Sequence, residues 1–161
     1  SQMITPFYPV PFGNLPAKIN AVHLDSPLNL LNSKITPFQL NHPQGCIGYR
    51  IERDNKVLVY ATDTEPDGGK LDEILLEHSK GADLLIMDSN NTIEEAKSRK
   101  GWGHSTWVDC VNIAKKANVK KLLLFHHDPF HDDNLVFEKE AEAQRQFRNS
   151  FCAFEDMQIE I

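Results

Sequence analysis

The first half of the chain shows the alternation of apolar and polar residues that is typical of β-strands. The segment Lys18–Leu24 alternates in this way, and Cys46–Ile51 places apolar residues at every second position. Lys56–Ala61 is a nearly continuous apolar run, which is typical of a buried strand. Because the turn-forming residues Arg53-Asp54-Asn55 separate the last two segments, we expect them to form a β-hairpin.

In the second half, apolar residues recur with the helical spacing of three and four positions, and short apolar segments lie between the helices. One helical stripe ends before Gly81, and another begins at Trp107, where Ser105 or Thr106 is the expected N-cap. The expected elements of this half, in chain order, are a helix from Leu71 to His78, a strand Asp83–Met87, a helix Thr92–Lys100, a helix from Trp107 to Ala114, a strand Lys121–Phe125 and a helix Asp132–Ser150. This alternation predicts an α/β (α+β) fold in which helices cover at least one face of a mixed sheet.

Composition narrows the class of protein. The chain has 161 residues, which suits one domain, and its formal net charge of −6 disfavours a dedicated nucleic-acid-binding module, although a compact phosphate-containing substrate stays compatible. Three widely spaced cysteines indicate neither a disulfide framework nor a thiolate zinc site, and they favour a reducing, cytoplasmic setting. The apolar runs are too short to span a bilayer, so we expect no membrane partner. Four prolines within residues 1–16 predict an extended connector there.

Chemically active side chains follow three of the expected strands. Asp63, Asp88 and the triplet His126-His127-Asp128 each follow one of them. In open α/β sheets ligands gather beyond the carboxyl ends of strands, and imidazoles with carboxylates are donors that Zn²⁺ accepts. Each residue alone has an ordinary explanation, since an aspartate after a strand is usually a turn or N-cap residue and a histidine is usually an ordinary polar residue.

A set of short motifs surrounds these residues between positions 38 and 130. In chain order they are Asn41-His42-Pro43, Gly45-Cys46-Ile47-Gly48-Tyr49-Arg50-Ile51, Tyr60-Ala61-Thr62-Asp63-Thr64-Glu65, Ala82-Asp83-Leu84-Leu85-Ile86-Met87-Asp88, Gly103-His104-Ser105-Thr106 and Leu122-Leu123-Leu124-Phe125-His126-His127-Asp128-Pro129. Together they resemble the metallo-β-lactamase superfamily, in the branch that holds the tRNA 3′-end endonucleases (ribonuclease Z) and related cyclic-phosphate phosphodiesterases.

The resemblance implies a centre of two divalent metal ions, with zinc expected first and manganese or iron as alternatives. His42 matches a ligand of the first metal, Asp63 matches the bridging carboxylate, and His126 matches a ligand of the second metal. If the strand continues, His127 faces the opposite way from His126, because successive side chains alternate. Which of the two histidines is the ligand is left open.

The resemblance also implies a catalytic pair. Asp88 and His104 match an acidic residue and a histidine that protonate the leaving group in the ribonuclease Z branch. That branch usually has glutamate where this chain has Asp88, which is one methylene shorter. A carboxylate beside His104 would stabilise its protonated form, the form that donates a proton to a departing oxygen.

One part of the family pattern is absent. The leading HxHxDH motif, which supplies the remaining metal ligands of the superfamily, does not occur in this sequence. We therefore interpret residues 1–161 as a single partial domain, the C-terminal half of an αββα sandwich, which a missing N-terminal half or another chain completes. Such a half predicts an apolar sheet face without a cover. A homo-oligomer is also compatible with this interpretation.

The resemblance thus implies a metal-dependent hydrolase, in which a metal-activated hydroxide cleaves a phosphodiester of a small phosphoester or an RNA end, with an incomplete site in this chain. Two alternatives stay open. One is a metal-free interaction or scaffold domain without catalysis, and the other is the same fold acting on a thioester or lactone. Elsewhere, we expect Trp102 and Trp107 to be packing residues, His131 to lie in a polar loop, and the acidic run Glu138–Glu142 to form a solvated helix face.

Overall fold

The computed structural model describes residues 23–161. Its elements, in chain order, are β1 (Leu28–Leu30), β2 (Ser33–Leu40), β3 (Cys46–Arg53), β4 (Lys56–Ala61), α1 (Lys70–Ser79), β5 (Leu84–Asp88), α2 (Ile93–Ser98), α3 (Trp107–Ala117), β6 (Leu122–Phe125), α4 (Asp133–Gln146) and β7 (Ser150–Cys152). The expected connector at residues 1–16 and most of the expected strand Lys18–Leu24 lie outside the described residues. His23 and Leu24, which are described, belong to no strand.

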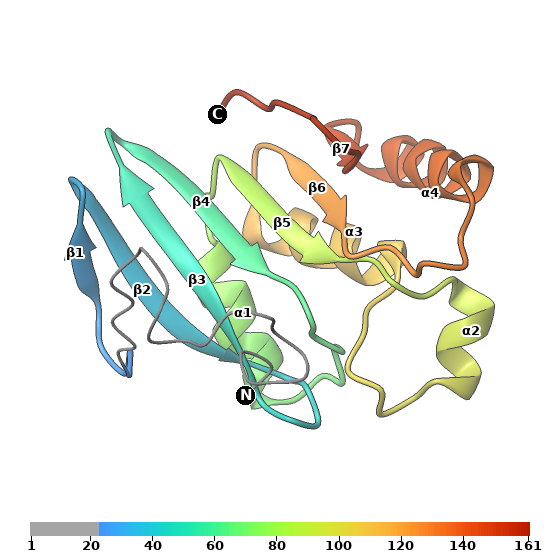
Figure 1. Cartoon of the computed structure of the whole chain (residues 1–161), viewed down its shortest axis with the longest axis horizontal. Coiled ribbons are helices and arrows are strands. Elements are labelled where there is room, and N and C mark those ends of the chain that lie inside the picture. Colours follow the sequence, from blue (N-terminus) through green and yellow to red (C-terminus); the bar gives the residue numbers. More distant parts are fainter. Residues whose placement is uncertain (1–22) are drawn as a thin grey trace, which may run out of the picture.

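The strands form one seven-stranded sheet in the sequential order β1 to β7 (Figure 1). Neighbours from β1 to β4 are antiparallel, and neighbours from β4 to β7 are parallel. Helices connect the parallel strands, because a parallel neighbour requires a crossover that returns the chain to the same end of the sheet. The α/β fold with a mixed sheet is therefore confirmed.

The antiparallel half contains the hairpin that the sequence predicts. β3 pairs with β4 up to Arg53 opposite Lys56. Asp54 and Asn55 form the two-residue turn with φ values of 49° and 61°. Positive φ at both turn residues matches the right-handed twist of the strands, and aspartate and asparagine tolerate it better than most residues.

The sequence pattern does not predict β1 or β2, and Pro37 gives the reason for β2. Proline cannot donate a hydrogen bond to a β-ladder, so a run that contains it looks unlike a strand. In the structure, β1 pairs with β2 only from Ser33 to Ile35. Within residues 23–161, one edge of β2 therefore has no neighbouring strand at Pro37, and such edges are where sheets tolerate proline.

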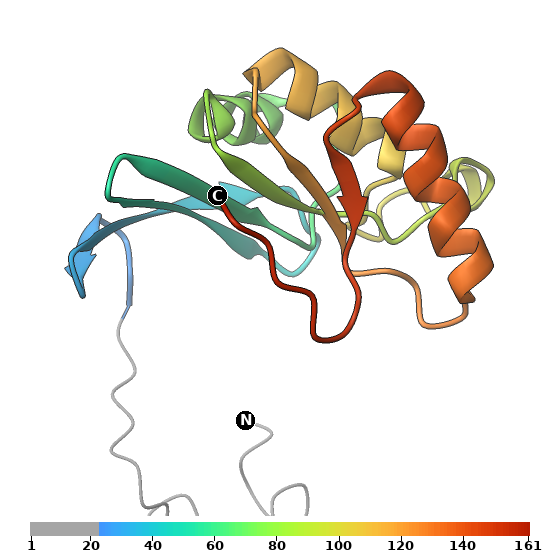
Figure 2. The ribbon, with the colours of Figure 1, turned by 90° about the horizontal axis from the view of Figure 1, so that it is seen from above.

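The hydrophobic core lies between the sheet and one layer of helices. Figure 2 shows α1, α3 and α4 on the same face of the sheet. β4 and β5 direct every second side chain into this layer, which buries the set Val59, Ala61, Leu85 and Met87 completely. Cys110, Val111 and Ala114 of α3 pack against them and are also fully buried.

The opposite sheet face is apolar, and no described helix covers it (Figure 2). Tyr60 and Ile86 are register neighbours on this face, and the ring of Phe125 lies 6.2 Å from that of Tyr60. Ile47 and Phe125 are 44% and 37% exposed. An apolar sheet face without a covering helix is what the sequence predicts for a partial domain that packs against another part of the protein or another chain.

The N-cap of α3 is one of the two residues that the sequence predicts, whereas the end of α4 differs from the prediction. Thr106 is the N-cap of α3, where it and Asp109 form a reciprocal capping box. The expected helix Asp132–Ser150 is too long: α4 ends at Gln146, and Phe147 has extended backbone. Ser150–Cys152 instead form β7 beside β6, because three residues are too few to show a period and their pairing is non-local. No described helix, α4 included, is long and apolar enough to cross a membrane.

Candidate metal and catalytic site

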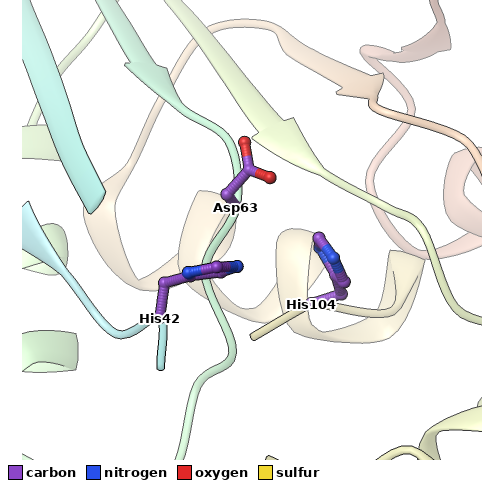
Figure 3. Close-up of side chains that lie close together, drawn as sticks. All are labelled: His42, Asp63 and His104. Carbon is purple, nitrogen blue, oxygen red and sulfur yellow. The ribbon is translucent and has the colours of Figure 1, made fainter. Parts of the chain in front are cut away.

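The site residues that the sequence predicts gather at one edge of the sheet. Asp63 follows β4, Asp88 ends β5 and His126 follows β6. Because these strands are parallel neighbours, their carboxyl ends lie side by side. The loop between β2 and β3 brings His42 to the same edge, and the segment before α3 brings His104 (Figures 1 and 3).

The side chains of this cluster are close enough to share a ligand. Potential ligand atoms of His42, Asp63 and His104 lie within 4.8 Å of one another, and so do those of Asp88, His104 and His126. Nε2 of His126 is 3.3 Å from Oδ1 of Asp63. Figure 3 shows His42, Asp63 and His104 around a common space. The structure therefore brings together all five residues that the resemblance singles out.

Two of these residues have a strained backbone. Asp63 and His126 have φ values of 59° and 54°, in the left-handed region that costs a residue with a side chain about 1–3 kcal/mol. The N–H of Asp63 donates to Oδ2 of Asp88 over 3.1 Å. The side-chain amide of Asn90 donates to the carbonyl of His126, also over 3.1 Å. These bonds hold both residues in conformations that turn their side chains toward the cluster.

Asp88 is the buried centre of the site, with no exposed surface. Its Oδ2 lies 2.6 Å from Nδ1 of His104, and its Oδ1 accepts the N–H of Asn90 over 2.9 Å. Burial raises the pKa of Asp88, and these hydrogen bonds act in the opposite direction. With Nδ1 bonded to this carboxylate, the Nε2 atom of His104 is the one left to act in the cluster.

The loop that carries His104 is fastened by Glu65, a residue that the sequence does not single out. Its carboxylate accepts the N–H groups of Gly101 over 2.9 Å and Gly103 over 2.8 Å. Gly103 lies against the ring of His42: a Cβ atom at that position would be 2.2 Å from Cδ2 of the ring. The glycine allows this approach, so His42 and the His104 loop fix each other's position.

The structure also distinguishes the two adjacent histidines. The side chain of His126 is 40% exposed and faces Asp63, whereas both ring nitrogens of His127 are shielded from solvent. Burial and the nearby charge of Lys139 lower the pKa of His127 to about 4. His126 is thus the histidine that the loop presents to the cluster.

Comparison with known proteins identifies the family. The family model described as the beta-lactamase superfamily domain matches residues 5–127. The chain belongs to this superfamily. Its sequence is similar to the ribonuclease Z-like branch: a ribonuclease Z of Sulfurisphaera tokodaii is 36% identical over 120 residues, which are 66% of this chain and 38% of the relative. A ribonuclease Z of Brevibacillus brevis is 37% identical over 94 residues, which are 56% of this chain and 28% of the relative.

Solved structures agree on the fold. The metallo-beta-lactamase fold protein YhfI from Bacillus subtilis matches with a TM-score of 0.68 and 27% identity, over 83% of this chain and 52% of that protein. Human tRNase Z, short form, matches with a TM-score of 0.62 and 20% identity, over 83% of this chain and 45% of that protein, which shows the fold alone. The chain therefore spans about half the length of these solved structures and less of its curated relatives.

The donor set fits the divalent cations that the superfamily implies. It combines imidazole nitrogens with a carboxylate, and zinc binds both kinds of ligand. Softer cations prefer thiolates and harder cations prefer oxygen ligands alone. The distance between His126 and Asp63 and the strained backbone of both residues fit side chains positioned for a common ligand. His42 and the bonded pair of Asp88 and His104 complete the wall around the same space.

A second cluster of ionisable side chains, which the sequence does not predict, includes Asp128 from the loop of His126. Glu95, Asp128 and His131 also offer ligand atoms within 4.8 Å of one another. The guanidinium of Arg99 already fills this position, at 2.6 Å from Asp128 and 3.3 Å from Glu95. Burial opposes ionisation of Glu95, but hydrogen bonds from Thr92 and His131 lower its pKa to about 2. We read the group as an internal ion-pair network.

Of the expectations about other residues, the one for Trp102 is wrong. His131 lies in a loop with polar contacts, as expected, although its side chain is only 4% exposed and bonds to Glu95. In the acidic run, Glu138 and Glu142 are exposed on α4, as expected, whereas Lys139 is buried and its ammonium donates to the carbonyls of Ser89 and Asn90 beside Asp88. Trp107 packs as expected at 8% exposure, but Trp102 is 61% exposed and does not.

Proposed function

We propose that the full-length protein is a metal-dependent hydrolase that cleaves phosphodiesters, in a small phosphoester or at an RNA end. The observation that carries this proposal is the 2.6 Å contact between Asp88 and His104 beside the cluster of His42, Asp63 and His126. The carboxylate–imidazole pair can supply a proton, and the neighbouring metal-binding donors can hold an electrophilic metal centre beside it. The similarity to ribonuclease Z proteins supports a nucleic-acid phosphoester as the substrate class.

In this proposal His42, Asp63 and His126 would hold the two divalent cations. Zinc suits these donors best, and manganese or iron are alternatives. Bound cations supply two effects, since they lower the pKa of coordinated water and neutralise charge on the phosphoryl group. We further propose that residues 1–161 are one partial domain, and that the other ligands come from an N-terminal half of a longer chain or from another chain.

His104 acts as the general acid in this proposal, and Asp88 positions it. Nδ1 of His104 donates to the buried carboxylate, which fixes the ring and stabilises its protonated form. Nε2 then donates its proton to the oxygen that leaves as the P–O bond breaks. A positioned acid of this kind contributes about 10²–10⁴-fold to a rate.

The leaving group provides the test. In the full-length protein, His104→Ala should slow a methyl phosphodiester by about 10²–10⁴-fold, because a methoxide leaving group needs the proton. The same variant should slow a p-nitrophenyl diester much less, since nitrophenolate departs without one. Asp88→Asn should show the same selectivity more weakly. His78→Gln, on α1, is the matched histidine control, and metal content is measured for each variant.

Each outcome has a distinct meaning. Equal loss for both esters at unchanged metal content would remove the general-acid role of His104. A metal-loaded wild-type protein that cleaves neither diester but cleaves a thioester or lactone would replace the proposed substrate class. A protein inert toward all of these substrates would instead be the interaction or scaffold domain that the sequence leaves open.

A further inference from the structure

Like that of Phe130, which is 93% exposed, the side chain of Trp102 is exposed although it is close in sequence to the site. It is 61% exposed, whereas Trp107, five positions later, is 8% exposed and packs in the core. Trp102 lies in the loop between α2 and α3, which runs along the edge of the sheet where the strands of the site end (Figure 1). An indole left in water forgoes the large gain of burying an aromatic ring, and its face stays available for stacking against a ligand.

The loop holds this ring outward in a defined conformation. The residues on both sides of it, Gly101 and Gly103, donate their N–H groups to the single carboxylate of Glu65. The N–H of Trp102 itself donates to the carbonyl of Arg99 over 3.1 Å. The exposed ring is therefore part of a hydrogen-bonded loop, which keeps the entropy cost of binding a flat ligand low.

Two cationic residues, Arg99 and Lys100, precede the ring in the chain, and Arg99 is ion-paired with Asp128 and Glu95. The guanidinium carbon of Arg99 lies 5.6 Å from the centroid of the indole. Lys100 is exposed and, within residues 23–161, forms no ion pair. Aromatic rings beside cations are the combination that binds single-stranded nucleotides, because bases stack on the ring while cations hold phosphates.

The backbone of Trp102 is close to that of His104, which it precedes by two residues, a separation of at most about 7 Å. We propose that Trp102 stacks on the nucleobase next to the scissile phosphate and that Lys100 binds the adjoining phosphate. This inference rests on the proposed phosphodiesterase function and names its substrate class: a diester with a nucleoside beside the cleaved bond.

The first test measures binding in the full-length protein without relying on catalysis. Adenosine 5′-monophosphate should quench the tryptophan fluorescence of the wild type, and ribose 5-phosphate, which lacks a base, should not. Trp102→Phe should lose the part of the quenching that comes from Trp102, whereas Trp107→Phe should keep it, because Trp107 is buried. Absence of quenching by adenosine 5′-monophosphate would overturn the inference.

The second test measures kinetics with the dinucleotide ApA and an abasic dinucleotide of the same charge. Trp102→Ala should lower kcat/KM for ApA by about five- to 150-fold, the equivalent of the 1–3 kcal/mol of base stacking, and leave the abasic substrate unchanged. Trp102→Phe should keep most of the wild-type value. Phe137→Ala is the control, because Phe137 lies on α4 and is equally exposed at 62%.

The two proposals fail in different ways. Equal loss for both dinucleotides together with lower stability would mean that Trp102 packs against another part of the protein, which would overturn the inference while leaving hydrolysis intact. Quenching through Trp102 without hydrolysis of either dinucleotide would support the nucleobase site and refute the proposed phosphodiesterase. Salt should weaken binding of ApA in the wild type more than in Lys100→Gln, since one phosphate contact is lost in that variant.

Discussion

Gly103 and Gly101 form a matched pair that tests the packing of the site. Both have a positive φ, at 92° and 84°, and both donate to Glu65. They differ in their surroundings. Among residues 23–161, a Cβ on Gly101 would meet nothing within 4 Å, whereas one on Gly103 would lie 2.2 Å from Cδ2 of His42 and 2.7 Å from Cδ of Pro43.

The expected energies follow from this difference. Gly101→Ala should cost about 1–3 kcal/mol in the free energy of unfolding, because alanine is strained at positive φ. Gly103→Ala carries the same strain and an added overpacking cost of about 1–3 kcal/mol. Because the overpacking displaces His42, zinc affinity should fall at least about tenfold in Gly103→Ala and stay near the wild-type value in Gly101→Ala.

Urea denaturation followed by circular dichroism measures the stabilities of the full-length variants, and calorimetric titration of the metal-free proteins measures zinc affinity. A Gly103→Ala variant no less stable than Gly101→Ala would contradict the close contact between Gly103 and His42. A folded Gly103→Ala variant that bound zinc as tightly as the wild type would show that the position of His42 does not depend on the glycine.

Three further predictions concern stability and reactivity. The pKa of Glu95 is lowered from 4.5 to about 2, so the stability that its charge gives the folded state is complete above pH 4.5 and is lost as the pH falls toward 2. Glu95→Gln should therefore lower the free energy of unfolding at neutral pH by about 1–2 kcal/mol for this partly exposed group. The urea midpoints of the variant and the wild type should converge as the pH falls from 4.5 to 2. Thr106→Ala removes the cap of α3 and should cost about 0.5–2 kcal/mol by the same assay, and an unchanged midpoint would contradict the capping box. Burial raises the pKa of Cys46, Cys110 and Cys152, the last to about 12. A thiol-specific disulfide reagent should therefore react slowly with these three thiols in the folded protein at pH 7 and more rapidly with all three after denaturation.

Local patterns predict the parts of the fold that local forces decide. The strand Lys56–Ala61 has the expected bounds, and the turn at Asp54 and Asn55 carries its own conformational preference. β2 and β7 escape prediction because Pro37 disguises the first and three residues are too few for the second. Each becomes a strand by pairing with a separate segment of the chain, β2 with β3 and β7 with β6.

The candidate site shows the same limit. The sequence places Asp63, Asp88 and His126 after strands, but only the resemblance to a family adds His42 and His104 to them. Their convergence depends on strand order and on backbone at positive φ, which no periodicity reveals.

The supporting residues are harder still to predict. Glu65 bonds to N–H groups 36 and 38 positions away, and Arg99 bonds to Asp128 across 29 positions. Trp102 looks like a core residue from its type alone. The glycines on both sides of it are the sequence signal that could have indicated an exposed ring in a tight loop.

The metal content of the purified full-length protein, measured beside its diesterase activity, tests the central proposal most directly. We expect about two divalent ions per active site. Asp63→Ala should lose most of this metal together with activity, because its carboxylate matches the bridging ligand of the two ions. A wild-type protein that is free of metal and hydrolyses phosphodiesters at an undiminished rate would contradict the proposed metal-dependent hydrolase.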